Sequence, residues 1–126
     1  MSKGVVVLIK KEGKFLFIEE KRDLMKGCWA PPHGRLEGNE KAKDAVVREV
    51  KEEVGLDVVP IRKVTATKAD TKVATVEWWE AKAVSNKVGV DQIEVADFGW
   101  FSIKEALGLK LYPGTKKFLE QFGGKL

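Results

Sequence analysis

The most informative stretch of this 126-residue chain is GRLEGNEKAKDAVVREVKEEVGL, residues 34–56. Apolar side chains recur in it every three or four residues from Ala42 to Val54, which is the spacing of one face of an α-helix. Asn39 suits the N-cap, and Glu40 suits the first turn near the positive end of the helix dipole. Gly55 suits the left-handed residue that often ends a helix. We therefore expect a helix over residues 39–54.

Three glutamates of this helix, Glu49, Glu52 and Glu53, are spaced at i, i+3 and i+4, so we expect their carboxylates to converge on one face. Like charges this close repel, and a purely structural helix gains nothing from the arrangement. A hard cation such as Mg²⁺ or Mn²⁺ would make the arrangement favourable, because it prefers oxygen ligands. A solvent-exposed Glu/Lys face explains the same spacing, so both interpretations stay open on the helix alone.

The segments before the helix predict a hairpin and an irregular stretch. Residues 4–9 are rich in Val and Ile and predict a buried strand. Residues 15–18 predict its returning partner, across a glycine-containing turn at residues 11–14. Residues 21–27 are charged and predict a loop. Residues 29–34 cannot be helical, because two prolines remove backbone donors and restrict the residues before them.

Strands and short helices follow the long helix. β-branched runs predict strands over residues 56–66 and 73–84, which form a second hairpin through residues 70–72. The later elements expected are a strand over residues 98–103 and helices over residues 103–109 and 115–122, the last two separated by residues 112–114. Hairpins combined with helices predict an α/β (α+β) fold with a mixed central β-sheet, in one domain over residues 1–126.

The composition disfavours several classes of protein. The formal net charge of +4 suits phosphate-bearing small molecules. The lysines are scattered among glutamates rather than gathered with aromatic residues, so nucleic acid is not expected as the main partner. No apolar run approaches the ~20 residues of a membrane helix. The N-terminal residues do not resemble a signal peptide and Cys28 is the sole cysteine, so we expect a cytoplasmic protein with no intrachain disulfide.

The stretch of residues 34–56 resembles the Nudix box, and each fixed position of that pattern is filled. The filled positions are Gly34, Glu40, Arg48, Glu49, Val50, Glu52, Glu53, Gly55 and Leu56. The surroundings are also similar to the family's, namely the leading hairpin, Trp29 and Pro32 before the box, and Trp100-Phe101-Ser102 near the C-terminus. The resemblance implies an α/β/α sandwich and hydrolysis of a diphosphate bond by water that Mg²⁺ or Mn²⁺ activates.

The resemblance also implies a set of metal ligands. Glu49, Glu52 and Glu53 match the family's metal-binding carboxylates. The family usually has two glycines where this chain has His33 and Gly34, and the residue at position 33 offers its backbone carbonyl to the metal. Because a carbonyl can come from any residue, His33 is compatible with this role, and it brings an imidazole near the phosphates.

A further glutamate is expected from the loop before the last strand. Glu94 lies six residues before Trp100, at the spacing expected from the resemblance, and is favoured over Asp91 and Asp97. The family does not keep its general base in one place. Three candidates therefore remain for that role: Glu49, Glu52 and Glu94.

The remaining box positions have supporting roles by resemblance. Arg48 matches the arginine that orients a glutamate through a charge-assisted hydrogen bond. Glu40 matches the structural partner of that arginine. Gly38 and Gly55 match turn positions of the box, and Gly34 matches a further structural position.

Aromatic residues give weaker indications about the substrate. Trp78 and Trp79 are adjacent on a predicted strand, so they point to opposite faces. One is expected in the core, and the other could stack on a base. Tyr112 precedes a Pro-Gly turn, where relatives that clean oxidised nucleotides place base-contacting residues. For each ring, a place in the core is the favoured interpretation.

The implied reaction leaves several substrates open. Residues typical of ADP-ribose hydrolases and of dinucleoside polyphosphate hydrolases are not evident at their usual distance, which favours a nucleoside triphosphate, oxidised or not. Arg22, Lys26 and Arg35 flank the site and could hold outer phosphates, although ordinary surface charge explains each of them equally well. Since no box glutamate is missing, an enzyme is expected rather than a non-catalytic nucleotide-binding module. A homodimer is left open.

Overall fold

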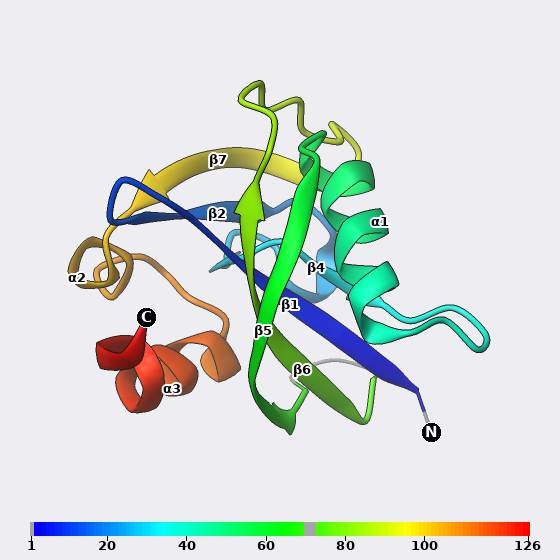
Figure 1. Ribbon diagram of the computed structural model, residues 1–126. Helices are drawn as coiled ribbons and strands as arrows, with labels where there is room; N and C mark the ends of the chain where they lie inside the picture. The colour runs from blue at the N-terminus through cyan, green and yellow to red at the C-terminus, as the bar shows by residue number, and fades with distance from the viewer. Residues whose placement is uncertain (1, 70–72) are drawn as a thin grey trace.

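The computed structural model describes residues 2–69 and 73–126 (Figure 1). Its strands are β1 (Lys3–Lys11), β2 (Lys14–Glu20), β3 (Trp29–Ala30), β4 (His33–Arg35), β5 (Val58–Lys68), β6 (Thr75–Ala83) and β7 (Val95–Phe101). Its helices are α1 (Ala42–Val54), α2 (Ile103–Ala106) and α3 (Pro113–Phe122), with 3-10 turns η1 (Asp23–Met25) and η2 (Gly123–Lys125).

The strand order is β3-β2-β1-β6-β5, with β4 paired to β1 and β7 to β2. Because β1 is parallel to β6 and antiparallel to β2, the predicted mixed sheet is confirmed.

Strand β1 lies at the centre of the sheet and is buried on both faces. Val5 and Val7 pack in one core cluster with α1, while Val6 and Leu8 pack in a second cluster with α3. Side chains of a strand point alternately to opposite faces, so this division places α1 and α3 on opposite sides of β1 (Figure 1). Burial on both faces explains why the strand reads as a continuous apolar run rather than an alternating one.

Helix α1 carries the predicted apolar stripe but begins later than the sequence predicts. It starts at Ala42 after Lys41, which makes no side-chain capping bond, so Asn39 is not the N-cap. The Glu40 carboxylate instead accepts hydrogen bonds from the Arg48 guanidinium and the Glu37 N–H, and this holds the preceding residues in a turn. The predicted end is confirmed, because Gly55 is left-handed with φ 74° and its N–H bonds to the helix.

The later elements agree with the prediction in kind and differ in their bounds. Strand β7 ends at Phe101, because Ser102 caps α2 in a reciprocal pair with Glu105. That helix is correspondingly short, ending at Ala106. Strands β5 and β6 pair antiparallel as expected, while the predicted turn at residues 70–72 lies outside the described residues. Among those described, no helix is long and apolar enough to cross a membrane.

Candidate active site

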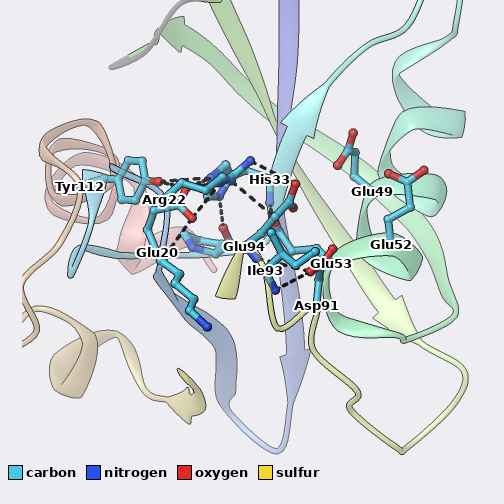
Figure 2. A network of polar contacts seen from close by, with 12 residues as sticks. Glu20, Arg22, His33, Glu49, Glu52, Glu53, Asp91, Ile93, Glu94 and Tyr112 are labelled. Carbon is cyan, nitrogen blue, oxygen red and sulfur yellow. Dashed lines mark hydrogen bonds and ion pairs between the residues drawn. The ribbon is translucent and has the colours of Figure 1, made fainter. Parts of the chain in front are cut away.

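A cleft of about 660 Å³ opens between the box helix and the start of α3. One wall is made by Arg48, Glu49 and Glu52 of α1. The other wall includes Glu20 and Tyr112, which lie 92 positions apart in the sequence and are joined by a hydrogen bond. Figure 2 shows Glu49 and Glu52 projecting from α1, beside a network of polar contacts around His33. The cleft therefore gathers charged side chains from distant parts of the chain.

Arg48 is the centre of the charge network on the helix side. Its guanidinium makes two 2.8 Å bonds to Glu40, and it also binds Glu49 at 2.8 Å and Glu52 at 3.1 Å. A further N–H donates to the backbone carbonyl of Arg35. The hydrogen bonds from Arg48 lower the pKa of Glu40 to about 2. Arg48 and Glu40 thus contact each other directly, and the orienting role predicted for them stays a prediction.

Glu49 lies directly against Gly34 of β4. A Cβ atom added at position 34 would overlap the Glu49 carboxylate. The backbone at Gly34 is not left-handed, so this overlap alone disfavours a larger residue there. Burial raises the pKa of Glu49, while the bond from Arg48 partly offsets that effect. Glycine at this fixed position of the box leaves room for the close approach of the Glu49 carboxylate to the strand.

Glu53 is buried behind the cleft rather than in its wall. It is 1 % exposed, and its carboxylate accepts a 2.8 Å hydrogen bond from the His33 N–H. Burial raises the pKa of Glu53 to about 7, against the opposing influence of His33 and Arg22. A carboxylate this deeply buried costs free energy when ionised unless a cation or several donors compensate it.

The three box glutamates do not converge in the way the sequence predicts. Within residues 2–69 and 73–126, no three His, Cys, Asp or Glu side chains lie close enough to hold a metal ion. The physical reason is that Arg48 draws Glu49 and Glu52 toward itself, while Glu53 points to the backbone of His33. Their roles as metal ligands stay a prediction.

The chemistry of these side chains nevertheless suits a divalent cation. The donors are carboxylate oxygens, the ligands that Mg²⁺ and Mn²⁺ prefer. Glu49, Glu52 and Glu53 lie within one turn of α1, and buried Glu53 has a raised pKa that a nearby cation would relieve. The residues present therefore fit the cofactor that the sequence implies.

Glu94 reaches the cleft from the loop that precedes β7. It lines the cleft, and its carboxylate lies 3.4 Å from the Arg22 guanidinium. Asp91 serves its own loop, because its carboxylate accepts the N–H groups of Ile93 and Glu94. Asp97 bonds the N–H of the next residue in β7. The structure thus brings the favoured glutamate to the site and gives the two aspartates local roles.

The opposite wall contains a carboxylate that sequence reasoning missed. Glu20 is 5 % exposed at the end of β2, where it accepts 2.8 Å bonds from the Tyr112 hydroxyl and from Arg22. Burial acts to raise the pKa of Glu20, but the bonds from Arg22 and Tyr112 outweigh it and lower the pKa. The available signal was strand alternation, since Glu20 follows Ile18 on a core-facing position where charged residues are rare.

His33 is positioned by its neighbours in the site. Its Nδ1 donates to the Pro31 carbonyl at 2.8 Å, and its Nε2 lies 3.4 Å from the Tyr112 hydroxyl. The two rings meet edge to face, with centroids 5.3 Å apart. The imidazole thus borders the cleft and supports Tyr112, while the backbone N–H of His33 serves Glu53.

The predicted substrate contacts have different positions in the structure. Arg22 and the exposed Arg35 line the cleft, as does Tyr112, whose hydroxyl is already bonded. Trp78 borders the cleft but is only 2 % exposed, because its ring stacks on Phe118. Trp79 packs in the core cluster under α1, so it is not placed to stack on a base. The two tryptophans do face opposite sides, as predicted.

A family model described as the NUDIX domain matches residues 2–122 of the chain. The chain belongs to the Nudix family. An ADP-ribose pyrophosphatase of Methanocaldococcus jannaschii is 49% identical over 49 residues, which is 39% of this chain and 29% of that protein. An NAD-capped RNA hydrolase of Pseudomonas aeruginosa is 26% identical over 82% of this chain and 37% of that protein. This Nudix chain thus spans about a third of the length of these curated relatives.

Solved structures of Nudix proteins resemble the chain over nearly its full length. A MutT protein from Methanosarcina mazei has a TM-score of 0.82 and 26% identity, covering 98% of this chain and 94% of its own. An ADP-ribose pyrophosphatase from Streptococcus suis has a TM-score of 0.75 and 28% identity, covering 90% and 81%. These likenesses confirm the predicted Nudix fold of helices packed on a mixed sheet.

Proposed function

We propose that this Nudix domain hydrolyses a diphosphate bond in a nucleoside diphosphate-linked small molecule, using Mg²⁺ or Mn²⁺. The observation that carries the proposal is the wall formed by Glu49, Glu52 and Arg48, which faces a cleft large enough for a nucleotide. Carboxylates gathered at one side of a cleft repel a bare phosphate. A divalent cation bound to them supplies the positive charge that attracts the diphosphate and makes a water molecule more acidic.

The residues of the chain divide the work of this reaction. Glu49, Glu52 and Glu53 hold the cation, together with the backbone carbonyl of His33 and the carboxylate of Glu94. Water attacks one phosphorus, a new P–O bond forms, and the bond from that phosphorus to the bridging oxygen breaks.

A carboxylate takes the proton that the attacking water loses. Glu52 is the carboxylate freest to do so, because its side chain is 59% exposed and its described contact is the ion pair with Arg48. Glu49 and Glu94 are the other candidates. Arg48 then keeps the glutamate that it binds in a fixed orientation.

Nucleoside triphosphates, oxidised or not, are the first substrates to test, since the residues typical of the other classes are not evident in the chain. ADP-ribose is the second candidate, because a curated relative and a solved structure with 28% identity both bear the name ADP-ribose pyrophosphatase. Among the described residues, the cleft is lined by apolar side chains of Val6, Met25 and Val76, while the rings of Trp78 and Tyr112 are buried. Such walls accommodate a base or a sugar without selecting one strongly.

The test is a panel of nucleoside triphosphates, ADP-ribose and dinucleoside polyphosphates, each incubated with Mg²⁺ or Mn²⁺ and analysed by product mass. We expect a nucleoside monophosphate among the products. In the variant Glu52→Gln, kcat should fall at least ~10²-fold with the fold intact, because the group is exposed. Glu120→Gln, at an exposed position of α3 outside the cleft, is the matched control and should retain full activity. No turnover of any member, or full turnover by Glu52→Gln, would refute the proposal.

A further inference from the structure

Arg22 lies among three carboxylates at the edge of the cleft (Figure 2). Its guanidinium binds Glu20 at 2.8 Å, lies 3.4 Å from Glu94 and lies 3.9 Å from Glu53. Two of these carboxylates, Glu53 and Glu94, are the glutamates that the proposed function gives to the cation. Arg22 therefore occupies the position of a counter-ion for part of the metal site.

One edge of the Arg22 guanidinium is held by Glu20, and the other edge can contact a ligand. Nε and one terminal nitrogen are fixed by Glu20, which is itself held by the Tyr112 hydroxyl. The second terminal nitrogen, Nη1, faces Glu94. Because the side chain is 45% exposed and lines the cleft, this second edge can reach a ligand without leaving its anchor.

A divalent cation held by Glu53 and Glu94 would compete with Arg22 for these carboxylates. A cation that binds Glu53 and Glu94 replaces the attraction that Arg22 offers them and repels the guanidinium. A guanidinium that loses a carboxylate partner is well suited to a phosphate, because its planar fork matches phosphate oxygens. Binding of the metal therefore changes which group the free edge of Arg22 prefers.

We propose that Arg22 is an exchangeable counter-ion: its free Nη1 edge neutralises Glu94 until the divalent cation binds, and then turns to the diphosphate of the substrate, while Nε and Nη2 stay on Glu20. This inference rests on the proposed function and adds an order of events to it. It predicts effects of opposite sign when Arg22 is removed, since the metal loses a competitor while the substrate loses a partner. If Arg22 had a purely structural role, its removal would weaken both metal binding and substrate binding.

The experiment is calorimetric titration of the substrate-free protein with Mg²⁺ at pH 8.5, above the pKa of about 7 of Glu53. Arg22→Met should bind Mg²⁺ roughly three- to tenfold more tightly than the wild type, the size that loss of the partly exposed ion pair with Glu94 gives. Arg22→Lys should tighten binding less. It can still pair with Glu20, so it provides the result if Arg22→Met does not fold. Arg62→Met is the matched control, because Arg62 pairs with Glu80 outside the cleft, and its Mg²⁺ affinity should match the wild type.

A second measurement tests the other half of the exchange. For the best substrate of the panel, KM of Arg22→Met should rise at least about fivefold at saturating Mg²⁺. Unchanged or weaker Mg²⁺ binding in both Arg22 variants, with normal binding in the wild type, would overturn the inference alone. A wild-type protein that binds no Mg²⁺ and hydrolyses nothing would overturn the proposed function, and the inference with it.

Discussion

The substitution Gly34→Ala tests whether the position of Glu49 is set by the backbone of β4. An alanine Cβ at position 34 would overlap the Glu49 carboxylate, which is the far end of a flexible side chain. We therefore expect the carboxylate to move and the backbone to stay. The displaced Glu49 loses its 2.8 Å bond with Arg48. The loss is worth about 1 kcal/mol in a partly buried site, or about 4 °C in Tm for a domain of this size.

The effect on activity should be much larger than the effect on stability. A metal ligand displaced by about an ångström reduces metal affinity ~10-fold and kcat/KM ~10²-fold. Mg²⁺ titration, steady-state kinetics and thermal unfolding of Gly34→Ala measure the three quantities. Gly89→Ala is the control, because nothing lies within 4 Å of its added Cβ. Near-normal kcat/KM in Gly34→Ala, or a fall in Tm much larger than about 4 °C, would refute the reasoning.

Two further predictions concern Glu40, which binds Arg48, and Glu20, which accepts a hydrogen bond from the Tyr112 hydroxyl. Arg48 lowers the pKa of Glu40 from 4.5 to about 2, so the folded state binds fewer protons in that interval. The resulting stability, about 1–2 kcal/mol after allowance for solvent screening, is complete above pH 4.5 and lost as the pH falls toward 2. Urea denaturation at several pH values should show this loss in the wild type and not in Glu40→Gln. The same dependence of the free energy of unfolding on pH in both proteins would contradict it. Tyr112→Phe removes the hydroxyl that donates to buried Glu20 and should lower the free energy of unfolding by about 1.5–3 kcal/mol, whereas unchanged stability in urea would show that the bond contributes nothing.

Local patterns in the sequence predict most of the fold. The stripe from Ala42 to Val54 and the glycine at position 55 predict α1 and its end, because helical periodicity and a left-handed cap depend only on neighbouring residues. The apolar run of β1 and the glycine turn after it predict the first hairpin in the same way. The start of α1 is different, because the long-range partner Arg48 takes the carboxylate of Glu40 away from any local cap.

The candidate site could be predicted only in part. The box spacing identifies Arg48, Glu49 and Glu52 as residues of one cleft wall, since they share a helix. The opposite wall depends on contacts between residues 20, 33 and 112, and no local pattern relates these positions. Alternation predicts that Trp78 and Trp79 face opposite sides of the sheet. It cannot predict that both are buried, because that depends on how α1 and α3 cover the two faces.

The dependence of hydrolysis on a divalent cation tests the central claim most directly. Initial rates on the best substrate of the panel would be measured with Mg²⁺, then in excess chelator, and then with Mg²⁺ or Mn²⁺ restored. The carboxylate wall of Glu49, Glu52 and buried Glu53 predicts that the chelator abolishes turnover and that either ion restores it. Undiminished turnover in excess chelator would contradict the account, because the carboxylates would then be acting without the cation they are proposed to hold.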